Sequence, residues 1–382
     1  MRFCVDAHAI GRHLTGNEAY VRNLLNGFAA LEDNSEFLAY VSAPGAEAYV
    51  PSSIETRKTS GNPFIRLGYD LSQQVRRDGA DLLHVQFTAP LACPVPVVVS
   101  VHDVSFLEHP EFFTRARRLQ LQYTVKRTVL RASRVLTLSE FSRQGIARAY
   151  DMDPARIAVV PAGVSSAFHP QPRQSSKAFV EGRFKVPGPF ILTVGDLQPR
   201  KNQIGLIHAF EELLGAYPEL PHHLMLVGKE TWFAPHVHQA AKRSSVRDRI
   251  HFTDYVSEKE LMELYSACEI FVFPSFYEGF GLPILEAMAC GRAVACSNTS
   301  AMPEVADSAG LLFNPESTGE IVRAMRDLLL NPELRQRMER LGQKNAAQFS
   351  WARTAQMTLE VYHEAVGEGR ETRVRKAATV RS

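Results

Sequence analysis

Two glutamates form the part of the sequence best suited to chemistry. Glu278 and Glu286 lie in the segment Phe273-Pro-Ser-Phe-Tyr-Glu-Gly-Phe-Gly-Leu-Pro-Ile-Leu-Glu. A strand is predicted to end near Phe273, and Pro283 suits the first turn of a following helix. Glu286 then lies one turn into an otherwise apolar helix, where a carboxylate is costly to bury unless it binds something, such as the vicinal hydroxyls of a ribose. A tight turn with Glu286 bonded to a backbone amide or a basic neighbour is an equal alternative for the isolated motif.

The loop between the glutamates also offers backbone donors. Gly279 and Gly281 allow backbone amides to approach a ligand closely. The amides of Gly281 and Leu282 would point out of a helix N-terminus, which suits a phosphate or an anionic sugar group. The dinucleotide fingerprint G-x-G-x-x-G fails because Ile284 occupies the third glycine position, and this counts against a dehydrogenase.

Basic side chains occur at two other junctions of strand and loop. Arg200 and Lys201 follow a predicted strand across a short polar loop. Two adjacent cations would neutralise the charge that grows on a departing diphosphate. His102 ends the apolar run Val95–Val101 and could hydrogen-bond a sugar hydroxyl. From position alone, a solvated Arg-Lys pair and a structural His-Asp pair are the commoner outcomes.

Short apolar runs alternate with amphipathic stretches in both halves of the chain. Several runs are unbroken, which is typical of parallel strands covered on both faces. The order predicts an α/β protein with two doubly wound, Rossmann-like domains facing each other across a cleft, and ligands beyond the carboxyl ends of the strands. The predicted strands are Arg2–Asp6, Phe37–Val41, Leu82–Val85, Val95–Val101, Val135–Leu138, Ile157–Val160, Phe190–Val194, His223–Val227, Arg249–Phe252, Ile270–Phe273, Ala293–Cys296 and Leu311–Phe313.

The predicted helices and domain boundaries complete this plan. Helices are expected at Glu18–Leu31, Arg115–Arg131, Ile204–Ala216, Ser257–Ala267, Pro283–Cys290, Gly319–Leu330 and Pro332–Phe349. The stretches His169–Lys177 and Pro187–Pro189 indicate a linker. We expect an N-terminal domain over 1–175 and a C-terminal domain over 176–349. A helix over 350–366, capped by Ser350, should pack back toward the first domain, and 367–382 should form a disordered basic tail.

Composition and charge exclude several classes of protein. Lys plus Arg number 43 and Asp plus Glu 41, so the net charge of +2 gives no bulk attraction to nucleic acid. Five cysteines without C-x-x-C spacing indicate neither a disulfide framework nor a zinc ribbon. No secretory signal or membrane-spanning run is present, so we expect a cytoplasmic protein, in part peripheral on the inner face of the membrane. Asp151-Met-Asp153 is interpreted as a turn, and no metal or cofactor is predicted.

The sequence resembles the retaining glycosyltransferases of family 4, which have the GT-B fold. Their signature, E-G-F-G-L-P-x-x-E, is matched fully from Glu278 to Glu286, and the similarity covers nearly the whole chain. It includes Asp6–Gly16, Val101–Val104, Gly195–Asn202, Asp254–Ser257 and Phe349–Trp351. The resemblance implies transfer of a hexose from a nucleotide sugar to a hydroxyl acceptor without a metal. It makes the first domain the acceptor side and the second the nucleotide-sugar-binding domain.

The resemblance also implies roles for single residues. Glu286 would hold the donor ribose, Glu278 would lie against the sugar ring or the forming bond, and His102 would contact the donor sugar. Lys201 would face the pyrophosphate. Many relatives carry an arginine directly after the glycine of this strand, where this chain has Asp196, so we expect Arg200 to supply that charge.

The remaining candidates are donor-binding positions in loops. Gly16 is expected against the donor phosphate or the acceptor, with a flexible surface loop as the open alternative. Tyr255 and Val256 are expected near the donor base, and Phe280 lies in the loop of Gly281 and Leu282. The Glu-Gly-Phe-Gly-Leu-Pro and Pro-Arg-Lys-Asn segments look most like bacterial mannosyltransferases of surface polysaccharide assembly. We therefore expect GDP-mannose as donor and a lipid-linked or oligosaccharide intermediate as acceptor.

Two other functions stay open at this point. The first is a nucleotide-sugar hydrolase or epimerase of the same fold, and the second is a non-catalytic nucleotide-sugar binder. Seven basic residues between Arg115 and Arg134 form a further candidate surface. Such a face would suit peripheral contact with anionic lipid or a phosphorylated acceptor, and a solvated helix face is an equal alternative. The sequence does not fix the oligomeric state.

Overall fold

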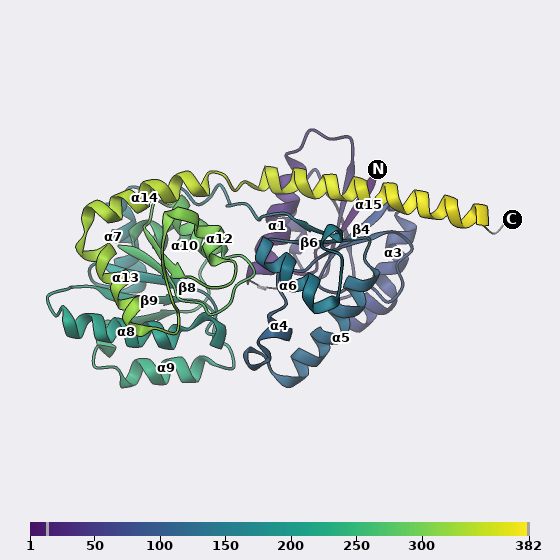
Figure 1. Cartoon of the computed structure of the whole chain (residues 1–382). Helices are drawn as coiled ribbons and strands as arrows, with labels where there is room; N and C mark the ends of the chain where they lie inside the picture. The colour runs from purple at the N-terminus through teal and green to yellow at the C-terminus, as the bar shows by residue number, and fades with distance from the viewer. Residues whose placement is uncertain (13–14, 380–382) are drawn as a thin grey trace. The chain divides into compact units, whose positions relative to one another are not determined.

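The computed structural model describes residues 1–12 and 15–379 and divides the chain into two compact units (Figure 1). The first unit combines Met1–Gly163 with the chain from Ser350 onward, and the second is Val164–Phe349. The boundary therefore precedes the expected one at 175. The predicted linker around 169–177 instead contains the start of a helix, α7 (Arg173–Phe184). This helix belongs to the second unit, and Ser176 and Val180 on its inner side are buried.

The first unit is built on a seven-stranded parallel sheet with the order β3-β2-β1-β4-β5-β6-β7. The chain runs outward from β1 to β3 and then crosses back to β4, so the carboxyl ends of β1 and β4 form a switch point of the kind where ligands bind. The predicted strands are confirmed, and β3 is an additional polar edge strand. The bounds are β1 (Arg2–Asp6), β2 (Glu36–Val41), β3 (Glu55–Lys58), β4 (Leu82–Gln86), β5 (Val97–Ser100), β6 (Arg134–Thr137) and β7 (Ile157–Val159).

Helices cover both faces of this sheet. They are α1 (Thr15–Ala29), α2 (Pro63–Ile65), α3 (Leu71–Arg77), α4 (Ser105–Glu108), α5 (Arg115–Arg131), α6 (Glu140–Tyr150) and α15 (Trp351–Thr379), with a π-helical turn at Arg66–Asp70. Helices α1 and α15 pack together over one face, and α15 also contacts β4, β5 and β6. Leu71 and Val75 of α3 and Val125 and Val129 of α5 join the alternate strand residues in one core cluster on the other face. This double cover explains the unbroken apolar strands.

The last helix, α15, is an integral part of the first unit. Gly27 of α1 gives it room, because a β-carbon there would lie 2.6 Å from the carbonyl oxygen of Trp351. The helix continues to Thr379, where a disordered tail over 367–382 was expected, and residues 380–382 of that tail lie outside the described residues. Arg134 on β6 forms ion pairs with Glu364 and Glu368, one turn apart, which hold the helix beyond its predicted end at 366.

The second unit repeats the architecture with a six-stranded parallel sheet of order β10-β9-β8-β11-β12-β13. Its strands are β8 (Phe190–Val194), β9 (His223–Val227), β10 (Ile250–Thr253), β11 (Ile270–Phe273), β12 (Val294–Ser297) and β13 (Gly310–Phe313). Its other helices are α8 (Gln203–Ala216), α9 (Ala234–Arg243), α10 (Glu258–Ala267), α11 (Leu282–Ala289), α12 (Met302–Ala306), α13 (Thr318–Leu330) and α14 (Pro332–Ala346). The predicted class of two parallel-sheet α/β domains is confirmed.

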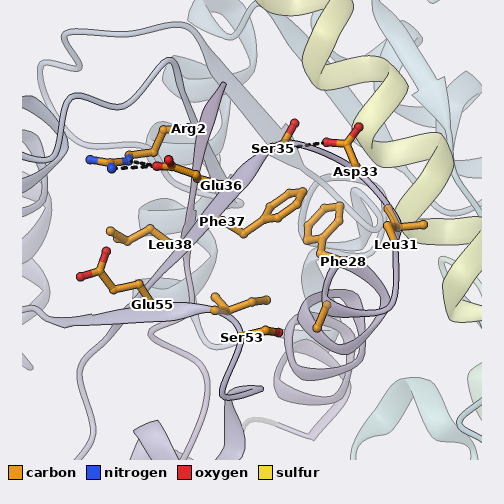
Figure 2. A pocket seen from close by; sticks show the side chains of 12 residues that line it. Arg2, Phe28, Leu31, Asp33, Ser35, Glu36, Phe37, Leu38, Ser53 and Glu55 are labelled. Carbon is orange, nitrogen blue, oxygen red and sulfur yellow. Dashed lines mark hydrogen bonds and ion pairs between the residues drawn. The ribbon is translucent and has the colours of Figure 1, made fainter.

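A pocket of about 520 Å³ lies where the first strands of the first unit begin (Figure 2). Phe28 and Phe37 stack in its wall with ring centroids 4.4 Å apart, and Arg2 pairs with Glu36 at its rim. The pocket belongs to the amino ends of β1 and β2. Ligands of parallel sheets collect at the opposite, carboxyl ends, so we do not place the active site here.

Candidate active site

The best-formed polar cluster lies at the switch point of the second unit. Strands β8 and β11 are neighbours in the sheet, although β9 and β10 lie between them in the chain. The loop after β8 carries Arg200 and Lys201, and the loop after β11 carries Glu278. Because both strands end at the same edge, the three side chains meet there.

Glu278 forms a buried ion triad with the two cations. Its Oε2 lies 2.6 Å from Nη1 of Arg200, and its Oε1 lies 2.6 Å from Nζ of Lys201. The side chain of Glu278 is only 9% exposed. Burial alone raises the pKa of Glu278, but the positive charges of Arg200 and Lys201 outweigh burial and lower the pKa to about 2. The carboxylate is therefore ionised throughout the physiological range.

The residues around Lys201 hold its ammonium group in place. Its Nζ lies 4.7 Å from the ring centre of Phe273, at the end of β11. Gly195 has a φ of 154°, and a β-carbon there would stand 3.0 Å from Cε of Lys201, so glycine is needed where the lysine chain passes. Asn202 ends the Pro199–Lys201 turn and accepts from the backbone N–H of Gly205 to cap α8. Burial lowers the pKa of Lys201, and the charge of Glu278 opposes that effect.

The loop before α11 is held from several sides. The backbone N–H of Glu278 donates to Oγ of Ser300 at 2.9 Å, and Phe280 packs edge-on against Phe349. Gly281 precedes the helix with a φ of 119°, a conformation that favours glycine, and α11 begins at Leu282, one residue before the predicted start at Pro283. The amino end of α11 therefore lies beside the ion triad, where its amides and dipole favour an anion.

Glu286 lies one turn into α11 and faces α10. The hydroxyl of Tyr265 donates to its Oε2 at 2.9 Å. Burial raises the pKa of Glu286 to about 7, and the hydrogen bond from Tyr265 opposes this rise. A group that donates hydrogen bonds to the carboxylate would stabilise its charged form. The two glutamates of one motif thus have opposite electrostatic environments.

Tyr255 and Val256 stand further along the same edge of the sheet. They follow β10, the edge strand, and Tyr255 is half exposed. Nζ of Lys229 lies 5.3 Å from the Tyr255 ring centre, and the backbone N–H of Lys229 donates to Oδ1 of Asp196. Asp196 itself follows β8. The predicted base-binding residues are therefore linked through Lys229 to the loop that carries the cations.

His102 lies in the first unit, two residues beyond the end of β5. Its ring lies edge-on to Tyr20 and Phe87, with centroids 4.6 and 5.4 Å apart. Neither ring nitrogen has a hydrogen-bond partner among the described residues. The backbone carbonyl of His102 accepts from Oγ of Ser142 at 2.8 Å. Burial lowers the pKa of His102 to about 4, so the imidazole is neutral at pH 7 and has one nitrogen that can donate and one that can accept a hydrogen bond.

The structure adds residues that the sequence interpretation missed. Gln86 ends β4, is 6% exposed, and has no hydrogen-bond partner for either side-chain amide atom within the described chain. The next residue, Phe87, has a φ of 57°, which is strained for an aromatic side chain. A buried relay runs from Tyr362 through His84 and Ser100 to Tyr20, at 2.6, 2.8 and 3.2 Å. Polar His84 and Gln86 inside an apolar strand were the available signal.

Gly16 does not occupy the predicted loop. It lies in the first turn of α1, and no described atom stands within 4 Å of where its β-carbon would be. Among the described residues, therefore, none requires a glycine at this position. Gly11, with a φ of 76° and its backbone N–H donating to Glu18, is the glycine that shapes this loop.

Residues 1–12 and 15–379 lack two kinds of feature. No cluster of three or more His, Cys, Asp or Glu side chains could hold a metal ion. No helix in that part of the chain is long and apolar enough to cross a bilayer.

The sequence of the chain matches known protein families over most of its length. Residues 14–168 match the family model described as Glycosyltransferase Family 4, and residues 175–345 match that of Glycosyl transferases group 1. O-antigen chain mannosyltransferase B of Escherichia coli is 33% identical over 266 residues, which is 69% of each chain. The chain belongs to glycosyltransferase family 4. The serotype-specific mannosyltransferase WbdA of Escherichia coli is 30% identical over 65% of this glycosyltransferase, which spans only 31% of the WbdA length.

Solved structures of similar fold agree with this assignment. A glycosyltransferase from Rickettsia africae superposes with a TM-score of 0.73 at 16% identity, covering 96% of this family 4 chain and 98% of that one. HepE of Anabaena, in complex with UDP-glucose, superposes with a TM-score of 0.74 at 19% identity, covering 95% and 100%. At these identities the structures show the shared GT-B fold, and the family assignment makes the protein a glycosyltransferase.

Proposed function

We propose that this enzyme transfers a mannosyl group from GDP-mannose, with retention and without a metal, to a hydroxyl of a lipid-linked or oligosaccharide acceptor. Two of its relatives, at 33% and 30% identity, are named as mannosyltransferases. The observation that carries the proposed chemistry is the buried triad of Arg200, Lys201 and Glu278 beside the amino end of α11. Such a cluster suits a diphosphate leaving group next to a cationic sugar.

In the second unit, the donor would bind by its charged and hydroxyl groups. Lys201 and Arg200 would contact the diphosphate, together with the amides of Gly281 and Leu282. Glu286 would accept hydrogen bonds from the ribose hydroxyls, which compensate the burial that raises the pKa of its carboxyl. Phe280 would support this loop, and Tyr255 and Val256 would lie near the guanine.

Transfer then breaks the bond between C1 of the sugar and the diphosphate oxygen. The electron pair of that bond goes to the diphosphate, and Arg200 and Lys201 stabilise the added negative charge. The ionised carboxylate of Glu278 stabilises the positive charge that develops on the sugar ring. The acceptor hydroxyl forms the new bond to C1 on the same face, and its proton goes to the departing phosphate oxygen. Neutral His102 would hydrogen-bond a hydroxyl of the sugar.

The proposal is tested by incubating the purified full chain with GDP-mannose, UDP-glucose and other nucleotide sugars, with and without oligosaccharide acceptors. We expect GDP release and a mannosylated product only when an acceptor is present, with the α-anomeric configuration of the donor kept in the product NMR spectrum. Lys201→Met should abolish transfer. Lys344→Met, at an exposed position of α14, should leave transfer unchanged. Donor turnover without an acceptor would replace the proposal with hydrolysis, and GDP-mannose binding without turnover would indicate a binder.

We also propose that the enzyme acts at the cytoplasmic face of a membrane, as a peripheral protein. An acceptor that is linked to lipid would be presented there. The support is a surface of the first unit, described in the following subsection.

A further inference from the structure

The first unit exposes a group of large apolar side chains on adjoining segments. They are Phe64 and Ile65 of α2, Tyr69 of the π-helical turn, Leu91 of the loop after β4, and Leu119 and Tyr123 of α5, with exposed fractions of 86, 54, 64, 61, 59 and 72%. We call these six residues the apolar patch. Exposed aromatic and aliphatic residues that gather on one region mark an interaction surface, whereas scattered ones need no explanation.

Hydrogen bonds join the three segments that carry the apolar patch. The backbone N–H of Leu91 donates to the carbonyl of Leu67, which lies between Ile65 and Tyr69. The guanidinium of Arg127 on α5 donates to the carbonyls of Pro90 and Leu91. The segment 63–70, the loop around 91 and helix α5 are therefore contiguous. The two helical residues Leu119 and Tyr123 are four apart and share the exposed side of α5.

The charge of this surface is strongly positive. Helix α5 carries six basic side chains and no acidic one. Lys126 and Arg131 are exposed on it, in the turns that follow Leu119 and Tyr123. The acidic residues nearest to α5 along the chain are in ion pairs, Glu108 with Arg148 and Glu111 with His109. Asp70, next to Tyr69, accepts hydrogen bonds from the backbone N–H of Ser60 and the side chain of Gln74.

We propose that the apolar patch and the basic side chains of α5 form a docking surface for an anionic lipid bilayer. Aromatic and aliphatic side chains enter the headgroup boundary, while lysine and arginine reach lipid phosphates. A second copy of this chain is a poor occupant, because a symmetric contact would place the six basic side chains of each α5 against those of its partner. The proposal deepens the proposed function, since it places the enzyme where a lipid-linked acceptor would lie.

The test measures binding of the full chain to vesicles without donor or acceptor, so its result is independent of whether transfer occurs. Vesicles rich in phosphatidylglycerol are compared with vesicles of phosphatidylcholine by co-sedimentation. We expect binding to the anionic vesicles that weakens with added salt. Lys126→Ala combined with Arg131→Ala should weaken it about twenty-fivefold, since each charge contributes about fivefold. Phe64→Ala should weaken it about tenfold through lost apolar burial.

Matched controls come from the second unit. Arg337 and Arg340 are exposed on α14, and replacing both with alanine removes the same charge elsewhere. Leu330→Ala removes an exposed apolar side chain away from the patch. Both controls should bind vesicles as the unaltered protein does, and circular dichroism should show that all variants are folded.

Three results would overturn the inference. The first is equal binding to anionic and neutral vesicles. The second is unchanged binding after the patch and α5 substitutions. The third is a shift from dimer to monomer in sedimentation velocity when the patch is altered, which would assign the surface to a second copy of the chain.

Discussion

Replacing Glu278 with glutamine separates two consequences of the ion triad. The pKa of this carboxyl is about 2 instead of 4.5, so its charged form is favoured in the folded protein by about 3 kcal/mol. Because the pKa is lowered, this stabilisation is complete above pH 4.5 and is lost as the pH falls towards about 2. At neutral pH, Glu278→Gln should therefore lower the free energy of unfolding by about 3 kcal/mol.

The same substitution should strengthen nucleotide binding. The carboxylate lies 2.6 Å from both Nη1 of Arg200 and Nζ of Lys201, so it competes with a diphosphate for the two cations. Removing this competing carboxylate should make the binding free energy of GDP more favourable by at least about 1.4 kcal/mol, which lowers the dissociation constant of GDP about tenfold. The rate of transfer should fall by about a hundredfold or more, because the charge facing the sugar is gone.

Calorimetry provides both measurements for Glu278→Gln. Thermal unfolding gives the stability, and titration with GDP gives the affinity, with exposed Glu316→Gln as a control that should change neither. If the glutamine variant bound GDP as weakly as Lys201→Met does, the carboxylate would be orienting the cations for the ligand. Competition within the triad would then be refuted.

Three further predictions concern other parts of the two units. Burial raises the pKa of Glu286 to about 7, so GDP affinity should rise between about pH 6 and 8 as the carboxylate forms, and titration of Glu286→Gln should show no such rise. A β-carbon on Gly228 would lie 2.2 Å from the carbonyl oxygen of Gly195, so Gly228→Ala should lower the free energy of unfolding by about 3 kcal/mol. The control is Gly182→Ala at an exposed position of α7, which should be neutral or stabilising. Equal thermal midpoints for the two variants would contradict this packing. Gln86→Met should stabilise the fold by about 1 kcal/mol and lower kcat/KM about tenfold, and unchanged kinetics would remove Gln86 from the site.

The sequence predicted the fold well where burial was uniform. Strands such as Phe190–Val194 and Ile270–Phe273 are covered on both faces, so their apolar runs coincide with the strand bounds. Polar edges gave no such signal, and β3, with the residues Glu-Thr-Arg-Lys, was missed. Helix α7 was interpreted as part of a linker because its buried side consists of only Ser176 and Val180. Local composition does not show which neighbours will cover a segment.

The sequence identified single candidate residues of the site but did not predict which of them form ion pairs. Motif spacing indicated Glu278, Lys201 and Arg200 separately, and their roles remain predictions. Arg200 and Glu278 are 78 positions apart, and their contact depends on β8 and β11 being adjacent, which follows from strand order alone. Gly16 was chosen because the resemblance implies a glycine of the first loop against the donor phosphate or the acceptor, but α1 begins before it.

The first unit draws on both ends of the chain, and this has a consequence for its biosynthesis. The second unit is continuous from Val164 to Phe349, so all of it leaves the ribosome before Ser350 does. Until Trp351 and Ala355 have been synthesised, the side of α1 around Gly27 stays uncovered. The second unit is therefore fully synthesised before the first unit, although synthesis of the first unit begins earlier. A stop codon ahead of residue 350 would leave the first unit without α15.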